Sequence, residues 1–110
     1  MKIAARHLDK MTIFDVSGDI DLANSPELRK ALLRELRELR TPRVILNMKA
    51  VRYIDSSGVA SLVEGLKASR DVAARFILFG LNNTVREVLQ LSKLVKIFEI
   101  YETEEQAVAP

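Results

Sequence analysis

Residues 44–66 read VILNMKAVRYIDSSGVASLVEGL, and they contain the strongest indication of the fold. It opens with the uninterrupted apolar run 44–46, which is typical of a strand that is covered on both faces of a sheet. From Ser56 onward the apolar residues recur at the spacing of one helical face, at Val59, Leu62, Val63 and Leu66. A buried strand therefore passes into a helix through the turn Asp55-Ser56-Ser57-Gly58, which predicts a βαβ arrangement.

Upstream of this stretch, the chain predicts a hairpin followed by a helix. Two short, partly apolar runs, Lys2 to His7 and Met11 to Ser17, are joined by Leu8-Asp9-Lys10. The segment 18–22 then breaks the strand pattern. Ser25 is the expected N-cap of the following helix, because Pro26 is favoured at a first helical position. That helix is expected to run to about Arg40, with one apolar face formed by Leu28, Ala31, Leu32, Leu36 and Leu39.

Downstream, the pattern alternates between strands and helices. Residues 76–79 form a second apolar run, which Gly80 ends. Thr84 and Glu87 have the spacing of a capping box for a third helix that carries Val88 and Leu89. Residues 98–101 predict a last short strand, and a C-terminal helix is expected after it, with Thr103 and Gln106 as its capping box.

The element order predicts an α/β fold with a mixed β-sheet. An N-terminal hairpin is followed by parallel βαβ units, and the helices pack on the sheet. We expect one domain over residues 1–110, since this length suits one compact unit. Such a unit can bury a core without metals or disulfides. The chain has no cysteine, which excludes disulfides and thiolate chemistry and agrees with a reducing cytoplasm.

Composition argues against nucleic acid and membrane partners. The chain has 17 basic and 15 acidic residues, a net charge of +2, and its densest basic stretch, residues 29–43, is interleaved with glutamates. We interpret that stretch as a solvated helix face rather than a nucleic-acid patch. No apolar run approaches the roughly 18 residues that a bilayer span requires. We therefore expect a cytoplasmic protein with no membrane insertion and no direct contact with nucleic acid.

The turn Asp55-Ser56-Ser57-Gly58 is the main functional candidate. A helix start presents unpaired backbone N–H groups and the positive end of the helix dipole. In the simplest interpretation, Asp55 and Ser56 only cap the helix. The same geometry would seat a phosphoserine, because the phosphate oxygens would meet those N–H groups without unfolding the domain. Composition alone leaves both interpretations open.

The motifs together resemble the STAS family, named after sulphate transporters and anti-sigma factor antagonists. The resemblance rests on Tyr53-Ile54-Asp55-Ser56-Ser57-Gly58-Val59 after the apolar strand, and on the upstream loop Val16-Ser17-Gly18-Asp19-Ile20-Asp21. Phe79-Gly80-Leu81 and the segment 85–91 match the later half of the family, so the similarity covers essentially the whole chain. It implies a STAS-like mixed sheet and a role as a protein-binding switch.

The resemblance also implies partners and roles for individual residues. An unphosphorylated family member binds an anti-sigma factor that is also a serine kinase, and thereby releases a sigma factor. The kinase phosphorylates the serine that corresponds to Ser56, and a phosphatase resets it. Asp19 and Asp21 match the partner-binding loop, while Asp55, Ser57 and Gly58 shape the switch turn. Asn47 departs from the family, because many relatives have an acidic residue there.

Other functions are less well supported by the sequence. An enzyme is disfavoured, because a serine nucleophile needs a base and the only histidine, His7, is on the first predicted strand. Asp19 and Asp21 alone are too few ligands for a metal site, and no motif predicts a cofactor. Within the family, the chain could instead be a subunit of a larger assembly, such as a stress-signalling scaffold or a lipid-transport ATPase. The acidic residues Glu99, Glu102, Glu104 and Glu105 are expected to form a solvated end.

Overall fold

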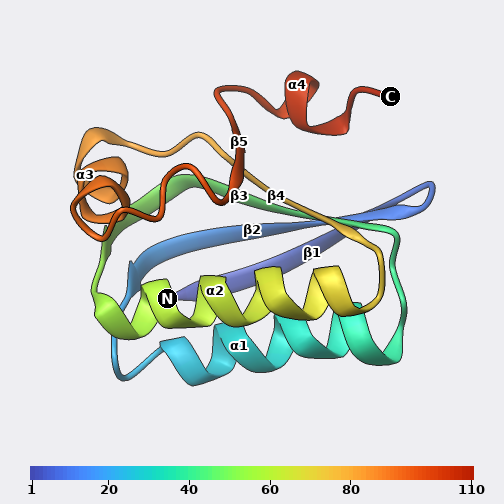
Figure 1. Cartoon of the computed structure of the whole chain (residues 1–110), viewed down its shortest axis with the longest axis horizontal. Coiled ribbons are helices and arrows are strands. Elements are labelled where there is room, and N and C mark those ends of the chain that lie inside the picture. Colours follow the sequence, from blue (N-terminus) through green and yellow to red (C-terminus); the bar gives the residue numbers. More distant parts are fainter.

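The computed structural model describes all residues, 1–110, as a five-stranded sheet with helices on both faces (Figure 1). The elements in chain order are β1 (Lys2–Leu8), β2 (Met11–Ile20), α1 (Ser25–Leu33), the π-helical turn η1 (Arg34–Glu38), β3 (Arg43–Ile54), α2 (Ser56–Asp71), β4 (Arg75–Phe79), α3 (Asn83–Leu91), β5 (Glu99–Tyr101) and α4 (Glu104–Val108).

The strands lie in the sheet in the same order as in the chain, from β1 to β5. β1 and β2 form an antiparallel hairpin, and every later neighbouring pair is parallel. The predicted mixed sheet, with a hairpin and parallel βαβ units, is therefore confirmed. Because β2, β3 and β4 all run in the same direction, the loops that leave their carboxyl ends meet at one edge of the molecule.

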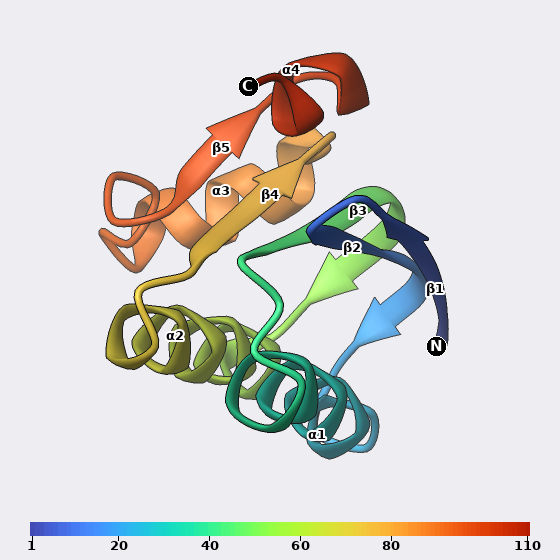
Figure 2. The same cartoon turned by 90° about the vertical axis from the view of Figure 1, so that its right-hand side faces the viewer.

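The core has two layers, because side chains alternate between the faces of each strand. The larger cluster joins one face of the sheet to α1, α2 and α3. Figure 1 shows α1 and α2 side by side along this face, and Figure 2 shows α4 on the opposite side of the sheet. There Ala107 of α4 packs with Ile13, Ile45, Ile77 and Phe79.

Of the predicted caps of α1, α3 and α4, the first two are wrong and the third is confirmed. Ser25 does not cap α1: Asn24 is at the N-cap, and Ser25 is buried, with its carbonyl oxygen accepting from the Ser61 hydroxyl at 3.1 Å. At α3 the side chain of Asn82 accepts from the N–H of Val85, so Thr84 and Glu87 do not form the expected box. In both places an asparagine just upstream supplies the N-cap residue. Thr103 and Gln106 do form their predicted capping box.

The first helix and the second strand end differently from the prediction. β2 continues through the predicted break to Ile20, because Gly18 adopts a φ of 90° and the ladder with β3 shifts register around it. After Leu33 the helix widens into η1, where the buried carboxylate of Glu35 accepts hydrogen bonds from Thr12 and Thr41. A π turn of this kind inserts a residue into the helical ladder.

The acidic C-terminal residues Glu99, Glu102, Glu104 and Glu105 are all partly or fully exposed to solvent, and most of them are also paired. Three of the four are paired within the chain: Glu99 with Arg75, Glu102 with Arg86, and Glu104 with Arg6. Arg43 also donates to the carbonyl oxygens of Ala107 and Ala109. These contacts fasten the last elements to β1, β3, β4 and α3.

Candidate functional site

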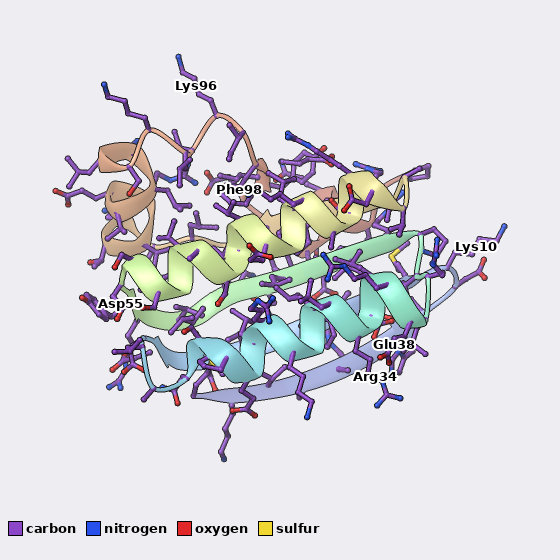
Figure 3. All side chains as sticks on the ribbon, turned by 60° about the horizontal axis from the view of Figure 1, so that its bottom comes forward. Lys10, Arg34, Glu38, Asp55, Lys96 and Phe98 are labelled. Atoms are coloured by element: carbon purple, nitrogen blue, oxygen red, sulfur yellow. The ribbon has the colours of Figure 1, made fainter.

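The predicted switch turn lies where β2 and β3 end, beside the loop 21–24 that leaves β2. The N–H of Asp55 donates to the carbonyl oxygen of Ile20 at 3.2 Å, which joins the two segments directly. Figure 3 shows Asp55 at the start of α2, at the opposite end of the molecule from Lys10 in the β1–β2 turn. The parallel strands therefore bring the two sequence motifs, 18–22 and 55–58, together.

Asp55 holds this junction with both carboxylate oxygens. One oxygen accepts from the N–H of Gly58 at 3.0 Å and caps α2, as the sequence predicted. The other accepts from the N–H of Leu22 at 3.0 Å, across the junction. Asp55 is thus both a helix cap and an anchor for the neighbouring loop, and only the first of these roles could be inferred from the sequence.

Gly58 permits the close contact between the start of α2 and the end of β2. A Cβ atom at this position would lie 2.4 Å from the carbonyl oxygen of Ile20 and 2.5 Å from Cγ1 of Ile54. No side chain fits there without moving backbone. The glycine is therefore required by packing rather than by an unusual backbone angle.

Ser56 is exposed on the first turn of α2, and its hydroxyl has no hydrogen-bond partner within the chain. Ser57 is half-buried beside it. Since Asp55 takes the N–H of Gly58, the N–H groups of Ser56 and Ser57 are the donors of this helix start without an intrahelical acceptor. An anion attached to Ser56 would meet these two donors and the positive end of a 16-residue helix.

The two acidic residues of the upstream motif have different environments. Asp19, at the end of β2, is half-exposed and lies 3.5 Å from the guanidinium of Arg52. Asp21 instead shapes the loop, because its carboxylate accepts from the N–H of Asn24 at 3.1 Å and its carbonyl oxygen accepts from Ser25 at 2.7 Å. Of the two, Asp19 has the more available side chain.

Two apolar residues at this end were not identified from the sequence. Leu22 is 73% exposed and Tyr53 is 47% exposed, although both are large hydrophobic side chains. Leu22 flanks Asp21, and Tyr53 pairs across the ladder with Asp19. Leu22 lies in the segment 18–22 that breaks the strand pattern, and Tyr53 lies just before the turn 55–58. Only their placement in three dimensions shows that the fold leaves them uncovered.

Asn47, the departure from the family pattern, lies on the other face of the sheet. Its amide donates to the carboxylate of Asp15 at 2.9 Å, and Arg6 makes a bidentate contact with the same carboxylate. The Arg6 hydrogen bonds, and secondarily that of Asn47, hold the pKa of Asp15 below its ordinary value. An acidic residue at position 47 would face Asp15, so the amide is the side chain that this cluster accommodates.

The residues weighed for catalysis and metal binding are not assembled into a site. His7 lies on β1, where its Nδ1 is 3.1 Å from the hydroxyl of Thr12, near the Asp9–Lys10 turn rather than near Ser56. No group of three or more His, Cys, Asp or Glu side chains is placed to hold a metal ion. None of the helices has the length and apolar character needed to cross a bilayer.

Fold and turn together define a class of protein: a mixed-sheet α/β domain that presents an exposed serine at the start of the helix after its longest strand. The chain belongs to the STAS domain family, whose family model matches residues 2–107. The family inferred from the sequence motifs is thereby confirmed.

Individual relatives agree with this assignment. The chain is 30% identical over 105 residues to the anti-sigma-B factor antagonist of Listeria monocytogenes, covering 94% of this chain and 90% of that protein. A solved structure from Thermotoga maritima, described as a candidate anti-sigma factor antagonist, superposes with a TM-score of 0.89 at 25% identity over 96% of this chain and 90% of that one. The Bacillus cell fate determinant SpoIIAA in its phosphorylated form gives 0.76 at 23% identity over 97% and 96%.

Proposed function

We propose that this protein is an anti-sigma factor antagonist that is switched by phosphorylation of Ser56. When Ser56 is unmodified, the protein binds an anti-sigma factor with serine kinase activity, and the sigma factor is released. When the kinase has phosphorylated Ser56, binding is lost until a phosphatase removes the phosphate. In this function the protein acts as a binding partner and phosphate acceptor, not as an enzyme.

The exposed hydroxyl of Ser56 at the start of α2 carries the proposal. A kinase must reach the hydroxyl, and this one is on the surface with no internal hydrogen bond to break. The phosphate would add roughly −1.5 to −2 charges beside two unpaired N–H groups, so the helix start would hold it. The added charge would then alter the binding of a partner protein rather than the fold of the domain.

The surroundings of Ser56 support a protein partner. Leu22 and Tyr53 give the apolar contact area that protein interfaces use at their centres, and the Asp19–Arg52 pair gives a charged rim. We assign partner binding to this surface, with Asp19 as its acidic contact and Asp21 as the residue that sets the loop. Single exposed apolar residues are ordinary, but here two of them lie at the same end of the sheet as Ser56.

The relatives support the same conclusion. Proteins named as anti-sigma-B factor and anti-sigma F factor antagonists match nearly the full length of the chain. SpoIIAA, which has the same fold, is known in a phosphorylated and an unphosphorylated form. A STAS protein that serves as a subunit of a scaffold or a transporter would share the fold. The two functions are therefore distinguished by identifying the partner protein.

The test uses the native partner. The protein is purified from its own cells with whatever binds it, and the partner is incubated with ATP and the wild-type chain or Ser56→Ala. We expect the partner to be a kinase that phosphorylates Ser56, as mapped on phosphopeptides, and Ser56→Ala to bind the partner but accept no phosphate.

The matched control is Ser57→Ala, which removes the neighbouring hydroxyl from the same helix turn and should still be phosphorylated. Phosphate solely on another residue would exclude the proposed switch. Capture of transporter or scaffold subunits with no kinase would replace the proposal with the assembly function.

A further inference from the structure

The free edge of β1 is the largest unpaired hydrogen-bonding surface of the sheet. β1 is the terminal strand and pairs only with β2, whereas the opposite edge strand, β5, has just three residues. Residues 4–8 are all exposed, and Figure 2 shows β1 at the margin of the sheet with no element beyond it. Strand edges of this length attract further strands unless something blocks them.

The hairpin register determines which peptide groups are free. Leu8 and Met11 face each other directly across the two-residue turn, so they exchange hydrogen bonds, and every second residue of β1 does the same. Lys2, Ala4, Arg6 and Leu8 therefore bond to β2. Ile3, Ala5 and His7 direct their N–H and C=O groups outward, away from the sheet.

Most of the usual protections of an edge strand are missing from β1, and its only cation besides Arg6 is Lys2, at the first residue of the strand. It contains no proline, and its ladder with β2 has no bulge. The charge of Arg6 does not block strand pairing at this edge, because its guanidinium forms ion pairs with Asp15 and Glu104 over the face of the sheet. The middle of β1 contains two alanines, Ala4 and Ala5, whose small side chains leave the backbone accessible.

We propose that β1 pairs with β1 of a second copy of this chain, antiparallel and centred on Ala5, so that the two sheets form one ten-stranded sheet. In this register Ala5 lies opposite Ala5, Ile3 opposite His7, and all three outward-facing residues of each copy are paired. The two-fold axis stands perpendicular to the sheet, as a closed dimer requires.

Charge selects this register over its neighbours. With Ala5 at the centre, Lys2 lies opposite Leu8, and Arg6 lies opposite Ala4. A pairing centred on Ala4 would place Lys2 opposite Arg6, and a pairing centred on Arg6 would place the two Arg6 residues opposite each other. Like charges directly opposite each other are destabilising. The contact is small compared with the roughly 1,200–2,000 Å² of stable complexes, so we expect a dissociation constant on the order of 100 μM.

The first experiment is sedimentation equilibrium of the full chain between about 10 μM and 1 mM, a range that brackets the expected dissociation constant. We expect the mass to rise from the monomer value of 12.4 kDa toward twice that value. Ala5→Pro should remain monomeric, because it removes the central outward N–H, a position where an edge strand tolerates proline. Ala5→Thr, which keeps that N–H, should still associate. A wild-type chain that stays monomeric throughout would overturn the proposal.

The second experiment tests the register and does not depend on the proline variant. The chain has no cysteine, so one introduced cysteine reports one position. Paired residues at the axis have Cα atoms about 5.5 Å apart, within the range of a disulfide, so Ala5→Cys should cross-link under mild oxidation. Ala4→Cys should not, because in this register the two copies of residue 4 are more than about 8 Å apart. Cross-linking through residue 4 but not residue 5 would overturn the proposed pairing.

Discussion

At the scale of single residues, the structure of the turn 55–58 depends on Asp55 and Gly58, which have different roles. Asp55 joins the loop after β2 to the start of α2 through two hydrogen bonds of 3.0 Å. Gly58 supplies the space in which that junction closes. Neither residue would react in the proposed phosphorylation of Ser56, but both hold the ordered helix start on which Ser56 is exposed.

Gly58→Ala tests this packing. The added methyl group would overlap the carbonyl oxygen of Ile20, which is backbone and has little freedom to move. We expect a loss of about 1–3 kcal/mol in the free energy of unfolding, measured by urea denaturation. The control is Gly65→Ala in the same helix, where the nearest atoms are ends of the Phe76 and Leu32 side chains at 3.0 and 3.1 Å. Equal destabilisation by both substitutions would contradict the role given to Gly58.

At the scale of elements, α4 is a short helix whose position depends on two arginines of other strands. Arg6 of β1 contacts Glu104 at 2.6 Å, and Arg43 of β3 donates to carbonyl oxygens at the other end of the helix. Beneath it, Ala107 closes the smaller core cluster. A five-residue helix has little stability of its own, so these contacts decide where it lies.

The acid stability of the protein should therefore depend on Arg6. Hydrogen bonds from Arg6 hold the pKa of Glu104 and of Asp15 below their ordinary values of 4.5 and 3.8. In acid the unfolded chain binds protons before the folded chain does, so stability is full above the ordinary pKa values and is lost as the pH falls through the lower, folded values.

Arg6→Gln should lower the unfolding temperature at pH 7, and its difference from wild type should shrink as the pH falls below about 4. Thermal unfolding between pH 7 and pH 2.5 would measure both effects. Lys2→Gln removes a charge from the same face of the same strand but breaks no ion pair. It should leave the pH dependence of the unfolding temperature unchanged. If the unfolding temperatures of wild type and Arg6→Gln fell in parallel between pH 7 and pH 2.5, the ion pairs of Arg6 with Asp15 and Glu104 would not contribute to acid stability.

At the scale of the whole molecule, the two ends of the parallel strands differ. The end with Ser56 carries Leu22 and Tyr53 on its surface, while the opposite end carries Leu39, which is 52% exposed. The proposed function uses only the first end, whereas the proposed dimer uses the edge of β1. A dimer would therefore leave both switch surfaces open to their partners.

Leu22→Ser should weaken binding of the cognate anti-sigma factor by about tenfold, since an exposed apolar side chain near an interface centre is worth on the order of 1–2 kcal/mol. Its unfolding temperature should not change, because the side chain packs against little within the chain. Leu39→Ser, at the far end, should alter neither. Binding would be measured by titration calorimetry, and equal losses from both variants would remove the assignment of this surface.

The element order, the mixed sheet, the family and the cap role of Asp55 could all be predicted from the sequence, because they follow from local periodicity and from motifs contiguous in the chain. The caps of α1 and α3 were misplaced, because Asn24 and Asn82 are also residue types that favour the N-cap position, and the local pattern does not rank them against Ser25 and Thr84. The three-dimensional packing was needed to show that Asp55 also binds the N–H of Leu22, that Gly58 lies against Ile20, that Glu104 contacts Arg6, and that Leu22 and Tyr53 stay exposed. These contacts join residues about 30 to 100 positions apart, and chain packing, rather than any local preference, brings such residues together.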